Sequence, residues 1–173
     1  QLDEQALDEL LDINLKAPLQ LTRACLPLLR EQPKALVVNV GSTYGSIGYP
    51  GYASYCASKF ALRGFSEALR RELADTPVNV LYVAPRATRT SMNSSAATAL
   101  NQALKVGMDD PVYVAKAVLQ AVQSERSELY LGWPEKMFVR LNGILPGLVD
   151  RALRKQLPLI RRHIGSHIKE PSK

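Results

Sequence analysis

Apolar residues recur with the period of a helix over the first thirty residues of the chain. They are Leu7, Leu10, Leu11, Leu15, Leu19 and Leu26, with acidic residues around the first of them and Arg30 at the end. This pattern predicts a long helix over residues 3–30. Asn14 and Pro18 interrupt it, and a proline inside a helix introduces a kink. Asn14 is therefore either a polar residue at a kink or a functional side chain.

Short apolar runs alternate with helical patterns through the middle of the chain. Residues 35–40, 78–84 and 128–131 are runs typical of buried strands, while residues 53–74 and 112–123 have helical spacing. Because the first two runs show no polar alternation, we expect strands covered on both faces, as in a parallel sheet. The order of helices and strands predicts the α/β class.

Two segments fall outside this alternation. Residues 86–107 are small, polar and Ala-rich with a weak helical pattern, and they follow the carboxyl end of a predicted strand. Open α/β sheets bind ligands at that end, so a mobile lid over a substrate is favoured over an inert linker. Residues 134–173 are amphipathic and basic, and we separate them as an extension from a domain over residues 1–133.

The charge of the chain is concentrated in this extension. The net charge is +6, and residues 151–173 alone carry seven basic residues and one acid, which leaves 15 of each sign in residues 1–150. A neutral body does not support a nucleic-acid-binding surface. The basic extension could dock on an anionic membrane, cover a hydrophobic substrate, or pack as an ordinary surface helix. His163 and His167 lie four residues apart without a third ligand, so no metal site is predicted.

Other features of composition point to a globular protein of a reducing compartment. Cys25 and Cys56 each lie in an apolar helical pattern, which predicts reduced core thiols and favours a cytoplasmic location. No apolar run approaches the length of a membrane span, and the acidic start of the chain is unlike a signal peptide.

Candidate chemistry lies between the first two predicted strands. Tyr55 is the only tyrosine followed by a lysine four residues later, Lys59, and that spacing puts both side chains on one helix face. An unperturbed tyrosine has a pKa of about 10. A neighbouring ammonium favours the phenolate, so we expect Lys59 to lower the pKa of Tyr55 and to make it a general acid and base.

Together with two further residues, this pair resembles the catalytic set of the short-chain dehydrogenases/reductases. Asn14 lies in the helix before the strand (DINLKAP), Ser42 ends the strand (VVNVGS), and Tyr55 follows thirteen residues later in YCASKFAL. The likeness covers residues 4–132. It implies a Rossmann-type doubly wound parallel sheet, here incomplete with three strands and their flanking helices.

The resemblance also implies an activity, namely NAD- or NADP-dependent hydride transfer between a carbonyl and an alcohol. Tyr55 would protonate the substrate oxygen, Ser42 would orient it, Lys59 would hold the ribose of the cofactor, and Asn14 would position a water. The remaining residues implied at the site are Pro85, Arg86, Thr88 and Thr90 for the cofactor, and Tyr44 and Met92 beside Ser42 for the substrate. A homodimer or homotetramer is implied through residues 4–30 and 53–74.

Three departures from the family pattern stand out. Arg86 occupies the place of a glycine beside the nicotinamide, so it either disturbs that contact or offers a cation to a phosphate or carboxylate. Gly41 stands where a serine is common. The chain contains no glycine-rich phosphate loop, and only thirteen residues precede Asn14.

Because of the third departure, we interpret the chain as the C-terminal portion of a reductase. We expect residues 1–173 alone to be inactive, to bind neither NAD(H) nor NADP(H), and to leave the strand at residues 35–40 without a neighbour.

The small, apolar residues after the second strand favour a hydrophobic or lipid-like substrate over a sugar. Two alternatives of other classes remain: a reductase-like protein that binds without turnover, and a peripheral membrane protein that acts through its basic extension.

Overall fold

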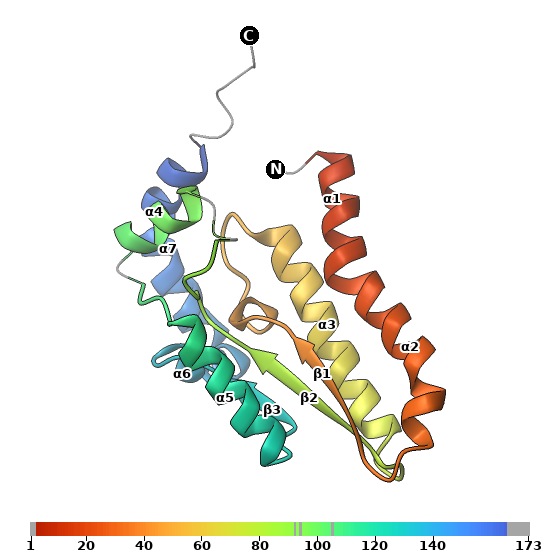
Figure 1. The fold of residues 1–173 in the computed structure, drawn as a ribbon. Coiled ribbons are helices and arrows are strands. Elements are labelled where there is room, and N and C mark those ends of the chain that lie inside the picture. The colour runs from red at the N-terminus through yellow and green to blue at the C-terminus, as the bar shows by residue number, and fades with distance from the viewer. Residues whose placement is uncertain (1–2, 92, 94, 105, 166–173) are drawn as a thin grey trace.

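A three-stranded parallel sheet forms the centre of the molecule (Figure 1). The computed structural model describes residues 3–91, 93, 95–104 and 106–165. The strands are β1 (Ala35–Val40), β2 (Val78–Ala84) and β3 (Glu128–Tyr130), in the order β1-β2-β3. Ala35 pairs with Val78 and Tyr82 with Glu128, so all three strands end at the same edge of the sheet. The predicted α/β class with a parallel sheet is confirmed.

One face of the sheet is covered by the N-terminal helices and α3 (Ala53–Glu72). Leu69 of α3 and Leu73, which directly follows that helix, form a buried cluster with Val78 and Val80 of β2. Further apolar side chains pack on this cluster, namely Leu26, Leu29, Ala35, Val37 and Phe65. The apolar stripes predicted for these helices therefore face the sheet.

Helix α5 (Pro111–Gln123) covers the opposite face, and Asp110 caps its first turn by accepting a hydrogen bond from the Val112 amide at 2.8 Å. A second buried cluster forms there from Leu81, Val83, Ala121, Leu129 and Leu131. The strands therefore lie between two layers of helices, as in a doubly wound sheet.

Strand β1 was expected to be covered on both faces, but its α5 side is partly exposed. Val38 and Val40 point to the α5 side of the sheet but are exposed, by 38% and 57%, because α5 packs over β2 and β3. The outer edge of β1 pairs with no other strand in the described part of the chain.

The long N-terminal helix contains a local change of helix type. Helix α1 (Glu4–Leu11) leads into a π-helical turn, η1 (Asp12–Lys16), and α2 (Ala17–Arg30) continues it. Asn14 lies inside η1, where the wider turn rearranges the backbone hydrogen bonds. The predicted interruption near Asn14 is therefore a π-turn.

Three helices complete the fold: α4 (Ser95–Ala103), α6 (Glu135–Ile144) and α7 (Pro146–Gly165). Helix α4, within the predicted lid, buries Leu100 and packs against α7. Asn142 of α6 donates a hydrogen bond to the Ser46 carbonyl at 3.0 Å, so the C-terminal helices contact the loop after β1. Whether the chain divides at residue 133 stays a prediction. Among the described residues, no helix is long and apolar enough to span a membrane.

Candidate active site

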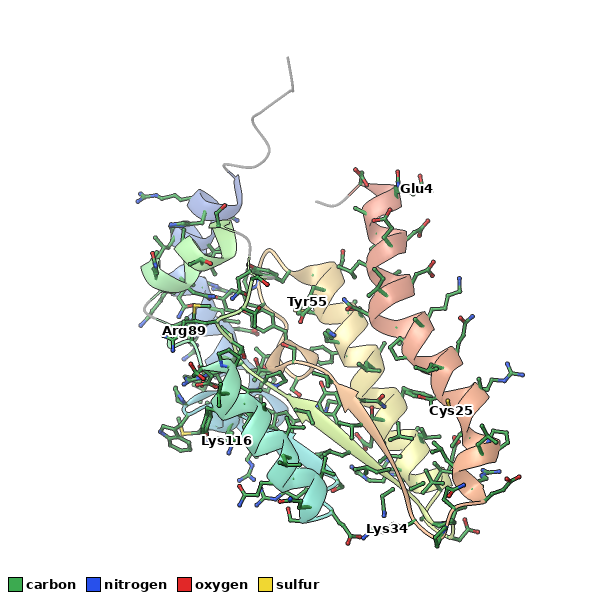
Figure 2. The ribbon with its side chains drawn as sticks, in the orientation of Figure 1. Glu4, Cys25, Lys34, Tyr55, Arg89 and Lys116 are labelled. Carbon is green, nitrogen blue, oxygen red and sulfur yellow. The ribbon has the colours of Figure 1, made fainter. Side chains whose placement is uncertain are left out.

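Ser42, Tyr55 and Lys59 meet at the carboxyl ends of the strands. Ser42 follows β1 and begins the short 3-10 helix η2 (Thr43–Gly45), where its hydroxyl accepts a hydrogen bond from the Tyr44 amide at 3.1 Å. Tyr55, labelled in Figure 2, lies in the first turn of α3, and its phenol lies near enough to the Ser42 side chain for that hydroxyl to affect its pKa. The Lys59 ammonium lies 5.6 Å from the centre of the Tyr55 ring. The structure thus brings these three side chains together.

Burial controls the protonation of this pair. Desolvation raises the pKa of Tyr55 above its ordinary value, and the Ser42 hydroxyl opposes the rise only in part. Desolvation also lowers the pKa of Lys59. The expectation that Lys59 lowers the pKa of Tyr55 is wrong for this structure, because the ammonium lies over the ring face while burial disfavours the phenolate. Tyr55 therefore stays a protonated phenol well past neutral pH.

Asn14 is connected to the same helix turn through Ser58. Its amide nitrogen donates to the Ser58 hydroxyl at 3.3 Å, and that hydroxyl donates to the Tyr55 carbonyl at 2.8 Å. Ser58 is fully buried and precedes Lys59 in the chain. Asn14 therefore braces the turn that carries Tyr55 and Lys59, a role that its sequence position alone did not suggest.

Tyr82 of β2 fixes the backbone of the loop that carries Ser42. Its hydroxyl donates to the Ser42 carbonyl at 3.2 Å and accepts from the Ser42 amide at 3.4 Å. A Cβ atom at Gly41 or at Gly45 would overlap the Tyr82 side chain. Gly41, a departure from the family pattern, is therefore required by the tyrosine on the neighbouring strand.

Three tyrosines gather around the reactive phenol of Tyr55. Tyr44 stacks on Tyr49 with ring centres 5.0 Å apart, and its ring meets Tyr55 edge-on at 6.3 Å. Tyr52 lies 5.5 Å from Tyr44. Stacked and edge-on aromatic rings attract one another beyond their burial. The approach to Tyr55 is therefore lined by an aromatic wall, of which the sequence analysis had singled out only Tyr44.

Arg86 forms ion pairs within the chain. Its guanidinium contacts Asp109 at 2.7 Å and Glu135 at 3.2 Å, and it donates to the Trp133 carbonyl at 3.4 Å. These carboxylates raise the pKa of Arg86, with the Asp109 hydrogen bond as the largest cause. Because two acids already neutralise Arg86, its cation is not available to a phosphate.

The other expected cofactor residues lie in the loop that follows β2. The Pro85 carbonyl accepts a hydrogen bond from the Thr43 amide at 3.1 Å. Thr88 forms an isolated bridge with Asp109, and Thr90 is exposed. Met92, expected to contact substrate, lies outside the described residues, as does His167.

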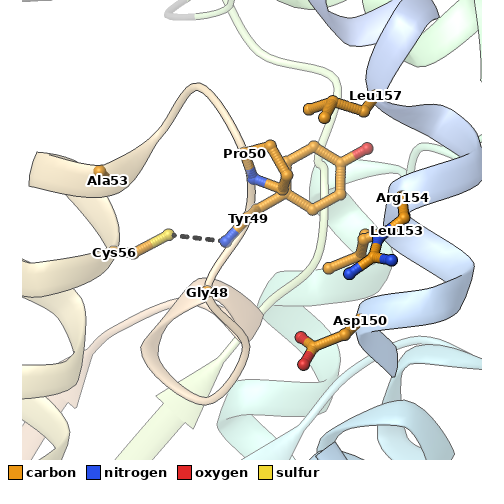
Figure 3. Close-up of a pocket in the computed structure, with 9 residues that line it drawn as sticks. All are labelled: Gly48, Tyr49, Pro50, Ala53, Cys56, Asp150, Leu153, Arg154 and Leu157. Atoms are coloured by element: carbon orange, nitrogen blue, oxygen red, sulfur yellow. Dashed lines mark hydrogen bonds between the residues drawn. The ribbon is translucent and has the colours of Figure 1, made fainter. Parts of the chain in front are cut away.

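A pocket of about 540 Å³ lies beside the tyrosine wall (Figure 3). One side is the loop at Tyr49 and Pro50 with the start of α3, and the other side is α7. The walls are mostly apolar, with Ala53, Leu153 and Leu157 among the lining residues and Asp150 and Arg154 beside them. The Tyr49 amide donates to the Cys56 sulfur at 3.3 Å, and the Tyr49 hydroxyl donates to Gln156 of α7 at 3.2 Å. Tyr49 therefore connects the pocket to the wall around Tyr55.

Comparisons with known proteins show which family the sequence and the fold resemble. A family model described as short chain dehydrogenase matches residues 1–101. The uncharacterized oxidoreductase YxnA of Bacillus subtilis (strain 168) is 31% identical over 173 residues, which is 96% of this chain and 47% of that protein. The chain spans about half the length of the curated relatives it matches.

Solved structures show the same likeness. A short-chain dehydrogenase from Streptomyces avermitilis aligns with a TM-score of 0.69 and 29% identity, covering 92% of this chain and 63% of that one. A short chain dehydrogenase from Burkholderia cenocepacia J2315 in complex with NADP aligns with a TM-score of 0.74 and 24% identity, covering 87% of this chain and 60% of that one.

Proposed function

This chain belongs to the short-chain dehydrogenase family, and from that premise we propose that it carries the catalytic residues of an NAD(P)-dependent oxidoreductase. The reaction interconverts a carbonyl and an alcohol by hydride transfer. The observation that carries the proposal is the placement of Ser42 and the Lys59 ammonium beside the Tyr55 phenol, at the carboxyl ends of the strands.

Each catalytic side chain has its own role in the reaction, and the protonation state of Tyr55 sets its role. Tyr55, with its pKa raised by burial, holds a proton at neutral pH and donates it to the substrate oxygen as negative charge develops there. Ser42 lies beside the same phenol and orients that oxygen by a hydrogen bond. In alcohol oxidation the Tyr55 phenolate would accept the proton, and because burial raises the pKa of Tyr55 that form is populated only at high pH. Asn14 acts indirectly, because it braces the turn through Ser58.

The residues present fit one end of a nicotinamide cofactor. Among the described residues, the Lys59 ammonium has a single long hydrogen bond, to the Val40 carbonyl at 3.5 Å, so it has donors to offer the hydroxyls of a ribose. When bound, NADP or NAD supplies the hydride. A structure of the same fold is in complex with NADP. Arg86 is paired with acids and does not extend the site toward a phosphate.

We propose a hydrophobic or lipid-like carbonyl or alcohol as the substrate. The tyrosine wall and the apolar pocket beside it support this class, since both offer large apolar surfaces close to the reactive phenol. We further propose a homodimer or homotetramer through α2 and α3, and a cytoplasmic location with peripheral contact to a membrane through residues 134–173.

The test replaces Tyr55 with phenylalanine, which removes only the hydroxyl, in the protein as its gene encodes it. We expect turnover to fall by about 100-fold or more, with cofactor affinity nearly unchanged, since general acid catalysis contributes that much. The matched control is Tyr113→Phe, on the exposed face of α5. Retention of most activity by Tyr55→Phe would refute the assignment.

A second candidate function is binding without turnover, which Arg86 at the family's glycine position favours. Nicotinamide absorbance with a panel of hydrophobic ketones, alcohols and sugars separates the two. Turnover of the hydrophobic ketones supports an enzyme, whereas tight binding of a ketone without turnover supports the binding protein.

A further inference from the structure

The turn between α6 and α7 exposes a cluster of large apolar side chains. Ile144 is 76% exposed, Leu145 51% and Leu148 49%, and Met137 of α6 is 46% exposed. Helix α7 buries Val149 and Ile160 against the rest of the molecule, so Leu148 belongs to its outward face. Contiguous apolar side chains left in water in this way mark an interaction surface.

Cations accompany these apolar side chains on the same helix faces. Along α6, Met137, Arg140 and Ile144 are spaced i, i+3 and i+7, which places them on one face. Along α7, Leu148, Arg151 and Lys155 repeat that spacing. All of these side chains are exposed. Each of the two helices therefore has apolar and basic side chains together on one exposed face.

The charge of this surface is almost entirely positive. Between residues 136 and 163 there is one acid, Asp150, and seven basic residues. They are Lys136, Arg140, Arg151, Arg154, Lys155, Arg161 and Arg162. Within the described part of the chain, none of the seven forms an ion pair. The nearest acid on α6, Glu135, is already paired with Arg86.

We propose that the α6–α7 corner docks on an anionic phospholipid surface. The apolar tip at Ile144, Leu145 and Leu148 enters the headgroup region, where apolar side chains leave water. Arg140, Arg151 and Lys155 flank it and attract the lipid phosphates, and their long stems keep the charges at the headgroups. A second copy of the chain fits this surface poorly, because pairing the two corners would bring together the three flanking cations of each copy, six in all. Docking of this kind needs no catalytic activity.

Vesicle flotation of the gene-encoded protein tests the proposal, because vesicles carry bound protein upward while aggregates sink. We expect the protein to float with vesicles of phosphatidylcholine and phosphatidylglycerol, and to stay behind with phosphatidylcholine alone. Replacing Ile144 and Leu148 with glutamine should weaken binding by about tenfold. Replacing Arg140 and Arg151 with glutamine should remove most of the dependence on phosphatidylglycerol and on salt.

The matched control replaces Val112 and Leu119 with glutamine, since these side chains are exposed on α5, outside the corner and the proposed subunit interface. Far-ultraviolet circular dichroism verifies that every variant is folded. The proposal is overturned if the wild-type protein does not float with the anionic vesicles. It is equally overturned if the control loses as much binding as the corner variant. Capture by soluble polyglutamate with the same dependence on Ile144 would assign the corner to an acidic protein instead.

Discussion

Replacing Arg86 with methionine should lower the free energy of unfolding by about 3 kcal/mol. The Asp109 side chain is 8% exposed and its Oδ1 contacts the guanidinium at 2.7 Å, while its Oδ2 is buried without a hydrogen-bond partner among the described residues. Removing one partner of a buried pair leaves an uncompensated charge and costs about 3–5 kcal/mol. Arg86 is itself 19% exposed and methionine fills much of its space, so the lower end of that range applies.

The neighbouring pair of Arg89 and Asp110 supplies the control. Its charged atoms are 3.7 Å apart and its side chains are 64% and 55% exposed. Arg89→Met should therefore change stability by less than about 0.5 kcal/mol. Adding Asp109→Asn to Arg86→Met should recover more than half of the loss, because an amide replaces the unpaired carboxylate.

Urea denaturation followed by circular dichroism measures all of these free energies. Equal, small losses for Arg86→Met and Arg89→Met would refute the view that the Arg86 pair is a buried link between the end of β2, Asp109 and the start of α6. A further loss of stability when Asp109→Asn is added to Arg86→Met would refute the same view. Either outcome would mean that solvent compensates the charge of Asp109.

Two further predictions concern the loop and the helix that carry the reactive side chains. Gly41→Ser should lower the free energy of unfolding by about 2–4 kcal/mol, because its Cβ displaces Tyr82 and breaks the hydrogen bonds of that phenol to the loop. The control is Gly64→Ala, at a helical position with no atom within 4 Å of the added Cβ, which should raise the free energy of unfolding by about 0.5–1 kcal/mol. Urea denaturation measures both variants, and a similar loss of stability at both glycines would contradict the packing argument. Lys59→Met should abolish turnover yet raise stability at neutral pH, because burial penalises the ammonium and lowers the pKa of Lys59. The gain in the free energy of unfolding should be complete below the lowered pKa of Lys59 in the folded protein. It should vanish as pH approaches about 10.5, where the unfolded lysine also loses its proton. Denaturation measured over a range of pH tests this, and a gain that grows with pH would contradict the expected direction.

The local features of the fold were predictable from the sequence. Strands β1 and β2 follow the apolar runs residue for residue, because buried parallel strands are continuous apolar segments. The position of the helix interruption near Asn14 was also predicted. Its form, a π-turn, depends on packing against α3, and no local pattern specifies that. Exposure of Val38 and Val40 was missed because the sequence does not say how far α5 reaches across the sheet.

The contacts of the candidate site were harder to predict, because they join residues distant in the chain. Arg86 pairs with Asp109 and Glu135, which lie 23 and 49 residues further on. Tyr82 holds the loop 40 residues before it, and the signal for it was a lone tyrosine in an otherwise aliphatic strand, VNVLYVA. The direction of the Tyr55 pKa was mispredicted because residue types reveal a nearby charge but not burial.

The free edge of β1 gives this strand two classes of amide proton. The amides of Ala35 and Gly41 bond across to β2, at 3.0 and 2.7 Å, and odd residues between them share that direction. The amides of Leu36, Val38 and Val40 therefore point away from β2, toward an edge that no other described strand covers. In hydrogen-deuterium exchange the odd amides should be slow and the even amides fast. Any strand that docks on this edge would slow the exchange of all three even amides together. The difference in exchange rate between odd and even amides therefore reports whether β1, the strand that leads to Ser42, has one neighbouring strand or two.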